Sequence, residues 1–230
     1  MRINGNLERL RMIARALGDL KNEVIFVGGS VAEFYAKDSA ATDIRQTMDV
    51  DCVIRLNSYS GLAELEKRMR SLGFQNDTDE DAPICRWVYD GEKVDVMPDD
   101  AKILGFSNRW YREAYHAREN IMLPDGQKIM IFPTLYYIAT KVEAVRDRAD
   151  DDLRLSHDFE DIVYVLNNSG RIKELWAECG DVELRNYLTQ WASELLQRRN
   201  IREEIECQLD GKEIDRAADV IDLLRLLAKG

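Results

Sequence analysis

The chain has 230 residues, 45% of them hydrophobic and 33% charged, and its formal net charge at pH 7 is −11. A chain of this length forms one large domain or two modest ones, and either can bury a sizeable core. The negative charge argues against broad, nonspecific binding to nucleic acid or to an anionic membrane surface.

The cysteine pattern and the N-terminal residues predict a cytoplasmic protein. The four cysteines show no CxxC spacing and the chain has two histidines, which argues against a zinc site and favours a reducing compartment. Residues 1–17 are too charged for a signal peptide, and no apolar run approaches the roughly 20 residues that a membrane helix needs. We therefore expect a cytoplasmic protein without a membrane partner.

The first quarter of the chain predicts a helix, a buried strand, a tight turn and a second strand. Apolar residues recur at a helical period from Leu7 to Leu17, so this helix is expected to pack on a sheet. The expected elements are a helix over residues 7–20, a strand over 23–27, a short helix over 31–35, a loop over 37–46 and a strand over 47–56. The turn between the first strand and the short helix is Gly28-Gly29-Ser30.

Two hairpin signals and a series of helical patterns follow. Asp90-Gly91 and Asp125-Gly126 are strong hairpin turn signals, and each lies between two strand-like runs. The expected elements are a helix over residues 62–72, strands over 84–89, 93–97, 120–123 and 128–132, and helices over 135–148, 158–166, 182–198 and 213–227, with Ser156 and Asp181 as N-caps. Strands therefore come first and helices later, with the change near Phe132. This order predicts an α+β domain over residues 1–132 and a helical domain over residues 133–230.

The Gly28-Gly29-Ser30 turn has the composition of a phosphate-binding turn. Gly28 and Gly29 can adopt backbone angles that are closed to other residues, and they let a ligand approach the backbone closely. Ser30 begins a helix whose free N–H groups favour an anion. We therefore expect Gly28, Gly29 and Ser30 to bind nucleotide phosphates.

Three aspartates on two predicted strands form a candidate metal site. Asp49 and Asp51 lie two residues apart on one strand, so both point to the same face, about 7 Å apart along the chain. Asp95 lies between two valines on a later strand and faces away from both of them, which makes a third carboxylate available. The pair could be the wet face of an edge strand, but the apolar run after it reads as a buried strand, where unpaired carboxylates are costly. Mg²⁺ bound by carboxylates and substrate phosphates is the usual partner of such a group.

The glycine turn, the Asp-x-Asp pair and the lone later carboxylate resemble the nucleotidyltransferase superfamily that includes DNA polymerase β. The resemblance implies a mixed twisted sheet with flanking helices, followed here by a C-terminal helical bundle. It also implies two Mg²⁺ ions, with Asp49 and Asp51 binding both and Asp95 binding the catalytic one. Gly29 and Ser30 would hold the β and γ phosphates of a nucleoside triphosphate. The gap between Ser30 and Asp49 is several residues longer than in the superfamily.

Two later motifs resemble those of the AbiEii/MenT-type toxin nucleotidyltransferases. Lys141, Ala144 and Arg148 match the pattern Lys-x-x-Ala-x-x-x-Arg. Asp158 and Asp161 match Lys-Asp-x-x-Asp-Leu, with a histidine in place of its lysine. The resemblance implies that Lys141 and Arg148 contact the nucleotide's phosphates and that Asp158 is catalytic, so that the helical domain completes the nucleotide site. A solvated helix face for the two cations, and a helix cap or an ion pair with Arg154 for the two aspartates, are the open alternatives.

Together these patterns predict a Mg²⁺-dependent enzyme that moves a nucleoside monophosphate from a triphosphate to an acceptor hydroxyl and releases pyrophosphate. The resemblance implies the 3′ end of tRNA as the acceptor, and the toxin role of a toxin–antitoxin or phage-defence system with a cognate antitoxin protein. The acidic charge argues against RNA and fits a small-molecule acceptor such as an aminoglycoside. A catalytically silent antitoxin or binding module of the same fold is the third alternative. DNA is not an expected partner.

Overall fold

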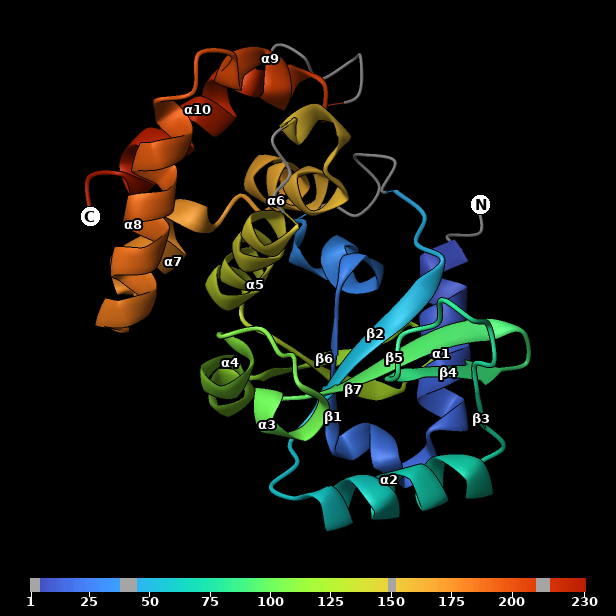
Figure 1. Ribbon diagram of the computed structural model, residues 1–230. Helices are drawn as coiled ribbons and strands as arrows, with labels where there is room; N and C mark the ends of the chain where they lie inside the picture. Colours follow the sequence, from blue (N-terminus) through green and yellow to red (C-terminus); the bar gives the residue numbers. More distant parts are fainter. Residues whose placement is uncertain (1–4, 38–44, 149–151, 210–215) are drawn as a thin grey trace. The chain divides into compact units, whose positions relative to one another are not determined.

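The computed structural model describes residues 5–37, 45–148, 152–209 and 216–230, which form two compact units (Figure 1). The first unit takes the described residues up to Val31 and from Arg45 to Pro133. The second takes residues 32–37 and the described residues from Thr134 onward. Most of the loop predicted over residues 37–46, and the start of the helix predicted over 213–227, lie outside the described residues.

Among the described residues, the first unit holds a seven-stranded mixed sheet, which confirms the predicted fold class. The strand order is β3-β4-β5-β2-β1-β7-β6. The strands are β1 (Val24–Val27), β2 (Asp49–Ile54), β3 (Gln75–Asn76), β4 (Arg86–Tyr89), β5 (Glu92–Pro98), β6 (Glu119–Met122) and β7 (Lys128–Ile131). β2 lies antiparallel to β1 on one side and parallel to β5 on the other. All four residues of β1 are buried, as the continuous apolar run predicts for a strand near the sheet centre.

Helices flank this sheet (Figure 1). They are α1 (Gly5–Ala16), η1 (Gly18–Asn22), α2 (Tyr59–Ser71), α3 (Ala101–Leu104) and α4 (Tyr111–Ala117), and η2 (Gly29–Tyr35) leads from the first unit into the second. The apolar stripe of α1 is buried, as its period predicts: Leu10, Ile13 and Ala14 have no exposed surface. Ser58 caps α2, since its hydroxyl accepts a hydrogen bond from the Gly61 N–H.

The hairpin between β4 and β5 has the turn that its sequence predicts. Asp90 and Gly91 both have positive φ, 49° and 82°, as a two-residue type I′ turn requires. The turn fixes the register of the two strands, so that Tyr89 lies opposite Glu92 and Arg86 opposite Asp95. This register places Arg86 beside Asp95 across the two strands.

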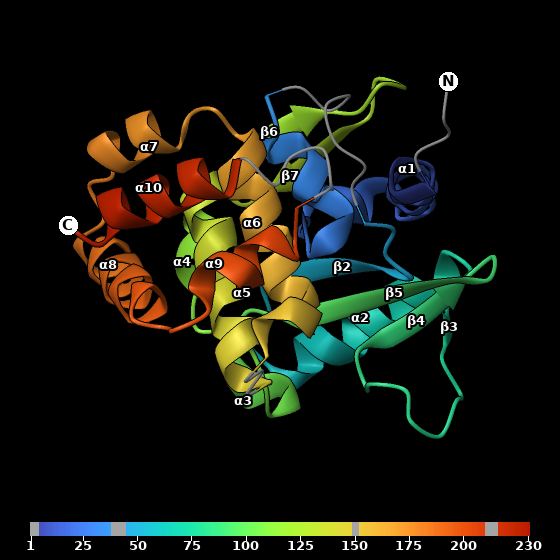
Figure 2. The same cartoon turned by 90° about the horizontal axis from the view of Figure 1, so that it is seen from above.

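The second unit is helical. Its helices are α5 (Thr134–Asp147), η3 (Leu153–Leu155), α6 (His157–Asn168), α7 (Ile172–Glu178), α8 (Val182–Leu196), α9 (Ile201–Glu206) and α10 (Ala217–Leu227). α5 packs against α6, and α7, α8 and α10 lie together in both views (Figure 2). The two predicted caps are confirmed, because Ser156 accepts a hydrogen bond from the Phe159 N–H and Asp181 accepts one from the Leu184 N–H. No helix of the described residues combines the length and apolar content that a membrane crossing needs.

The sequence patterns predicted the short helices and strands least well. The helix predicted over residues 31–35 is a seven-residue 3₁₀ helix, η2, that begins at Gly29. The patterns missed β3, α3, α4, α7 and α9, which are between two and seven residues long. Such segments span at most two turns of helix, so they show no repeating apolar period.

Candidate metal and nucleotide site

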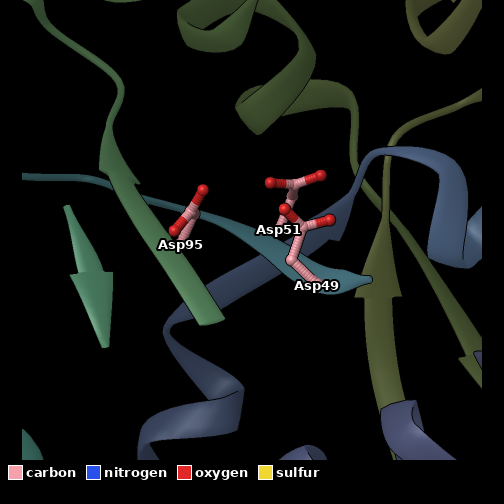
Figure 3. A group of neighbouring side chains, drawn as sticks. All are labelled: Asp49, Asp51 and Asp95. Carbon is pink, nitrogen blue, oxygen red and sulfur yellow. The ribbon is translucent and has the colours of Figure 1, made fainter. Parts of the chain in front are cut away.

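Three carboxylates stand on one face of the sheet in the first unit (Figure 3). β2 and β5 are parallel and Asp51 pairs with Asp95, so their side chains leave the sheet on the same side. Asp49, two residues before Asp51, shares that face. One carboxylate oxygen of each aspartate lies within 4.8 Å of those of the other two. The sequence-predicted triad is therefore brought together.

The same strands bury their other side chains, which explains why the acids are held in place. Val50 and Cys52 have no exposed surface and alternate with Asp49 and Asp51 along β2. Asp95 itself is only 7% exposed, so its charge is costly unless a cation balances it. The triad is thus partly buried, and Asp95 is the most buried of its three residues.

Gly28 packs directly against the Asp51 carboxylate. β1 ends at Val27, which pairs with Asp51 of β2, so the next residue turns over the acidic group. Gly28 has a φ of +74°, and a Cβ atom there would lie 2.0 Å from Asp51 Oδ2. Glycine is therefore required twice, for the backbone angle and for the space that the carboxylate fills. The predicted phosphate turn and the predicted metal ligands are neighbours.

Ser30 does not present its hydroxyl at this site. Its side chain is 1% exposed, and Oγ donates a 3.3 Å hydrogen bond to the Val27 carbonyl. Gly29 is also buried. In this conformation the turn offers a ligand its backbone at Gly28 rather than the serine side chain.

Arg86 is a member of the site that the sequence patterns missed. Its Nε donates to Asp95 Oδ1 at 2.8 Å, and its Nη2 donates to Asp95 Oδ2 at 2.7 Å and to Asp49 Oδ2 at 3.1 Å. Hydrogen bonds to Asp95, with the charges of Asp95 and Asp49, raise the pKa of Arg86, so the guanidinium stays charged. Counting back from the Asp90-Gly91 turn places Arg86 opposite Asp95, and this count could have found it from sequence.

Two cysteines lie near the triad, and Cys52 alternates with Asp51 along β2, so that its thiol lies on the other face of the sheet. Burial, with the negative charge of Asp95 added, raises the pKa of the Cys85 thiol to about 12. Burial also raises the pKa of Cys52 well above its usual range. Both thiols therefore stay protonated at neutral pH.

Two residues of α1 hold the segment that leads into β2. Asn6 has no exposed surface; its Nδ2 donates to the Arg45 carbonyl at 2.8 Å, and its Oδ1 accepts from the Thr47 N–H at 2.8 Å. Arg9 donates to the Thr47 carbonyl. Thr47 in turn donates from its hydroxyl to the Asp49 carbonyl at 3.1 Å. This chain of hydrogen bonds fixes the position of Asp49, the first aspartate of the triad.

The residues of the two later motifs form a buried cluster in the second unit. Lys141 Nζ of α5 lies 2.9 Å from Asp158 Oδ1 and 2.6 Å from Asp161 Oδ2 of α6. Arg148 pairs with the other oxygen of Asp158. Burial disfavours the charged lysine, but the two carboxylates outweigh it and raise the pKa of Lys141. The Lys141 side chain is 10% exposed and that of Arg148 is 62% exposed, so the two predicted phosphate ligands differ sharply.

The helix-cap and Arg154 alternatives do not describe this cluster. Ser156, rather than Asp158, supplies the cap of α6. Arg154 pairs with Asp152 and with Glu203. The cluster instead joins α5 to α6 through a lysine that both aspartates hold.

Comparison with known proteins agrees with this architecture. No known protein family matches the chain, and no curated protein matches it. Among solved structures, it is similar to an antigenic nucleotidyltransferase-like protein from Paracoccidioides brasiliensis, with a TM-score of 0.53 and 16% sequence identity. The match covers 91% of this chain and 95% of that chain. The chain therefore has a nucleotidyltransferase-like fold, and at this identity the likeness shows the fold alone.

Gly28→Ala is expected to abolish metal binding by the triad, because the new Cβ would displace the Asp51 carboxylate. The positive φ adds a strain of about 1–2 kcal/mol. Gly126→Ala is the matched control, since Gly126 has a φ of +83° and nothing within 4 Å of a Cβ. Calorimetric titration with Mn²⁺ and urea unfolding measure both effects. Loss of Mn²⁺ binding only in Gly28→Ala, with a loss of stability at least as large as that of Gly126→Ala, is the expected result; unchanged Mn²⁺ affinity in Gly28→Ala contradicts it.

Lys141→Met is expected to destabilise the protein by about 3–5 kcal/mol, because it removes the buried cation that lies between two buried carboxylates. Arg148→Met removes an exposed partner of the same cluster and is expected to cost about 1 kcal/mol or less. Urea unfolding at pH 7 compares the two. Similar small losses in both variants would show that Lys141 does not hold α5 to α6.

Proposed function

We propose that the chain is a divalent-metal-dependent nucleotidyltransferase, which moves a nucleoside monophosphate from a triphosphate to an acceptor hydroxyl and releases pyrophosphate. The observation that carries this proposal is the triad of Asp49, Asp51 and Asp95 beside the Gly28 turn, on a nucleotidyltransferase-like fold. Carboxylates close together on a rigid sheet, with a glycine turn packed on one of them, are the parts that this reaction needs.

The donor set fits Mg²⁺. The three candidate ligands are carboxylate oxygens, so a hard divalent ion is favoured over zinc. In the proposed assignment Asp49 and Asp51 hold two ions and Asp95 holds the catalytic one. When bound, such ions stabilise the charge on the attacking and leaving oxygens of an in-line displacement. Asp95, fixed by Arg86, also accepts a hydrogen bond from the acceptor hydroxyl and orients it.

The nucleotide-binding assignments are refined by side-chain exposure. Gly28 receives the triphosphate through its backbone, whereas Gly29 is buried and Ser30 supports the turn from inside. Of the two later cations, we assign phosphate binding to Arg148, because Lys141 is buried between two aspartates. Asp158 bonds to both cations, so we give it the part of positioning Arg148.

The family resemblance and the net charge favour different acceptors. The resemblance to AbiEii/MenT-type toxins favours the 3′ end of tRNA and a toxin role with a cognate antitoxin. The net charge of −11 favours a cationic small molecule, such as an aminoglycoside. The retained triad speaks against a catalytically silent module, because three facing acids are costly to a protein that needs only the scaffold.

Label transfer tests the reaction. Purified protein with Mg²⁺ and each α-labelled nucleoside triphosphate is offered total RNA or a mixture of aminoglycosides. Transfer of label to one of them is expected, and Asp51→Asn is expected to slow it by at least about a thousandfold, because several kcal/mol of transition-state stabilisation depend on this ligand.

Asp79→Asn is the matched control for Asp51→Asn, since Asp79 is a 72% exposed side chain of the same unit that pairs with Lys93. Its rate is expected to stay within about twofold of the unmodified protein, as for most exposed substitutions. Circular dichroism checks that all variants fold. Equal transfer by Asp51→Asn and Asp79→Asn would contradict the proposed reaction.

A further inference from the structure

Resting on this proposed function, we propose that Arg86 is a displaceable counter-cation of the acidic triad. It holds Asp95 permanently and releases Asp49 when a divalent cation binds. Arg86 sets the metal affinity of the free protein and positions Asp95 for the reaction. Both effects arise from one guanidinium, through its charge and its shape respectively.

The two contacts of Arg86 differ in strength. Towards Asp95 it makes two parallel hydrogen bonds of 2.8 and 2.7 Å, from Nε and Nη2. Towards Asp49 it makes a single bond of 3.1 Å, from an Nη2 that Asp95 already shares. Bidentate pairs are the stronger kind, and the Asp49 side chain is 32% exposed against 10% for Asp95. The Asp49 contact is therefore the one that breaks first.

The register of the sheet also distinguishes the Asp95 contact of Arg86 from its Asp49 contact. The Asp90-Gly91 turn locks β4 to β5 with Arg86 opposite Asp95, so these two residues separate only if the hairpin slips. Asp49 lies on β2, on the far side of β5 from β4. No backbone pairing ties it to Arg86 in the described sheet. The guanidinium can thus turn away from Asp49 while its bond to Asp95 stays.

The charge balance of the triad and Arg86 predicts how Arg86 affects metal binding. The three ionised carboxylates and Arg86 together carry a charge of −2, which one divalent ion neutralises. Without Arg86 the group carries −3 and has lost its competing cation. A charge so close to the metal changes the binding energy strongly even at an effective dielectric constant of about 20. Removing only the charge of Arg86 is therefore expected to tighten metal binding.

The test is calorimetric titration of the full chain with Mn²⁺ in the absence of nucleotide. Arg86→Gln is expected to bind Mn²⁺ about tenfold tighter than the unmodified protein, or more. Arg86→Lys keeps the charge but loses the fork, so its Kd is expected to stay within about threefold. Both variants are expected to lose nucleotidyl transfer, because Asp95 is no longer held through both oxygens. Unchanged or weaker Mn²⁺ binding by Arg86→Gln would overturn the proposal.

Arg68→Gln is the matched control for charge. Arg68 of α2 makes a similar two-bond pair with Glu23, at 2.9 and 2.6 Å, elsewhere in the first unit. Its loss removes one positive charge without touching the triad, so its Mn²⁺ affinity is expected to match that of the unmodified protein. Tightening in Arg68→Gln equal to that in Arg86→Gln would assign the effect to net charge and overturn the role of Arg86.

A measurement on the unmodified protein covers the case in which Arg86→Gln does not fold. Nitrogen NMR of labelled arginine side chains follows Arg86 during a Mg²⁺ titration, with Arg86→Lys assigning its signal. A shift of the Arg86 guanidinium signals that saturates with Mg²⁺ is expected, and no shift at saturation overturns the proposal. Asp51→Asn distinguishes a failure of the proposed role of Arg86 from a failure of the metal site. If it abolishes Mn²⁺ binding while Arg86→Gln has no effect, only the role of Arg86 fails; if the unmodified protein binds no Mn²⁺, the metal site fails as well.

Discussion

The parallel pairing of β2 with β5 is the constraint on which the site depends. It sets Asp51 beside Asp95 and, through the alternation of side chains, brings Asp49 to the same face. Like charges this close repel, so the sheet holds them only with a cation among them, and Arg86 of the next strand provides one. The turn at Gly28 leaves space for the Asp51 carboxylate, and the hairpin turn at Asp90-Gly91 sets Arg86 opposite Asp95.

The local parts of this arrangement could be predicted from the sequence, and the long-range parts could not. The Asp49 and Asp51 pair follows from strand periodicity, and the hairpin register follows from its turn. That β5 lies beside β2 does not follow from any local pattern, because 37 residues separate the two strands in the chain and the pairing is decided by packing of the whole sheet. Arg86 was missed although the turn placed it, because a lone arginine in a strand carries no signal of its own.

The helical unit shows how a matching motif can leave a role undecided. Lys141, Arg148 and Asp158 match the spacing of the two later motifs that the sequence resembles, and the structure brings them together. The lysine and the arginine both pair with Asp158, but the lysine side chain is buried and the arginine side chain is exposed. Helix packing decides which face of α5 is buried, and spacing along the sequence does not report it. The same limit applies to Ser30, whose hydroxyl turns inward to the Val27 carbonyl.

The most direct test of the central claim is a crystal structure of the full chain with Mn²⁺ and a non-hydrolysable nucleoside triphosphate, with the metal located by its anomalous scattering. Manganese is expected between the carboxylates of Asp49 and Asp51, with one ion also bound by Asp95, and the triphosphate is expected against the turn at Gly28. Nucleotide bound elsewhere, or a triad without metal while nucleotide is bound, would contradict it.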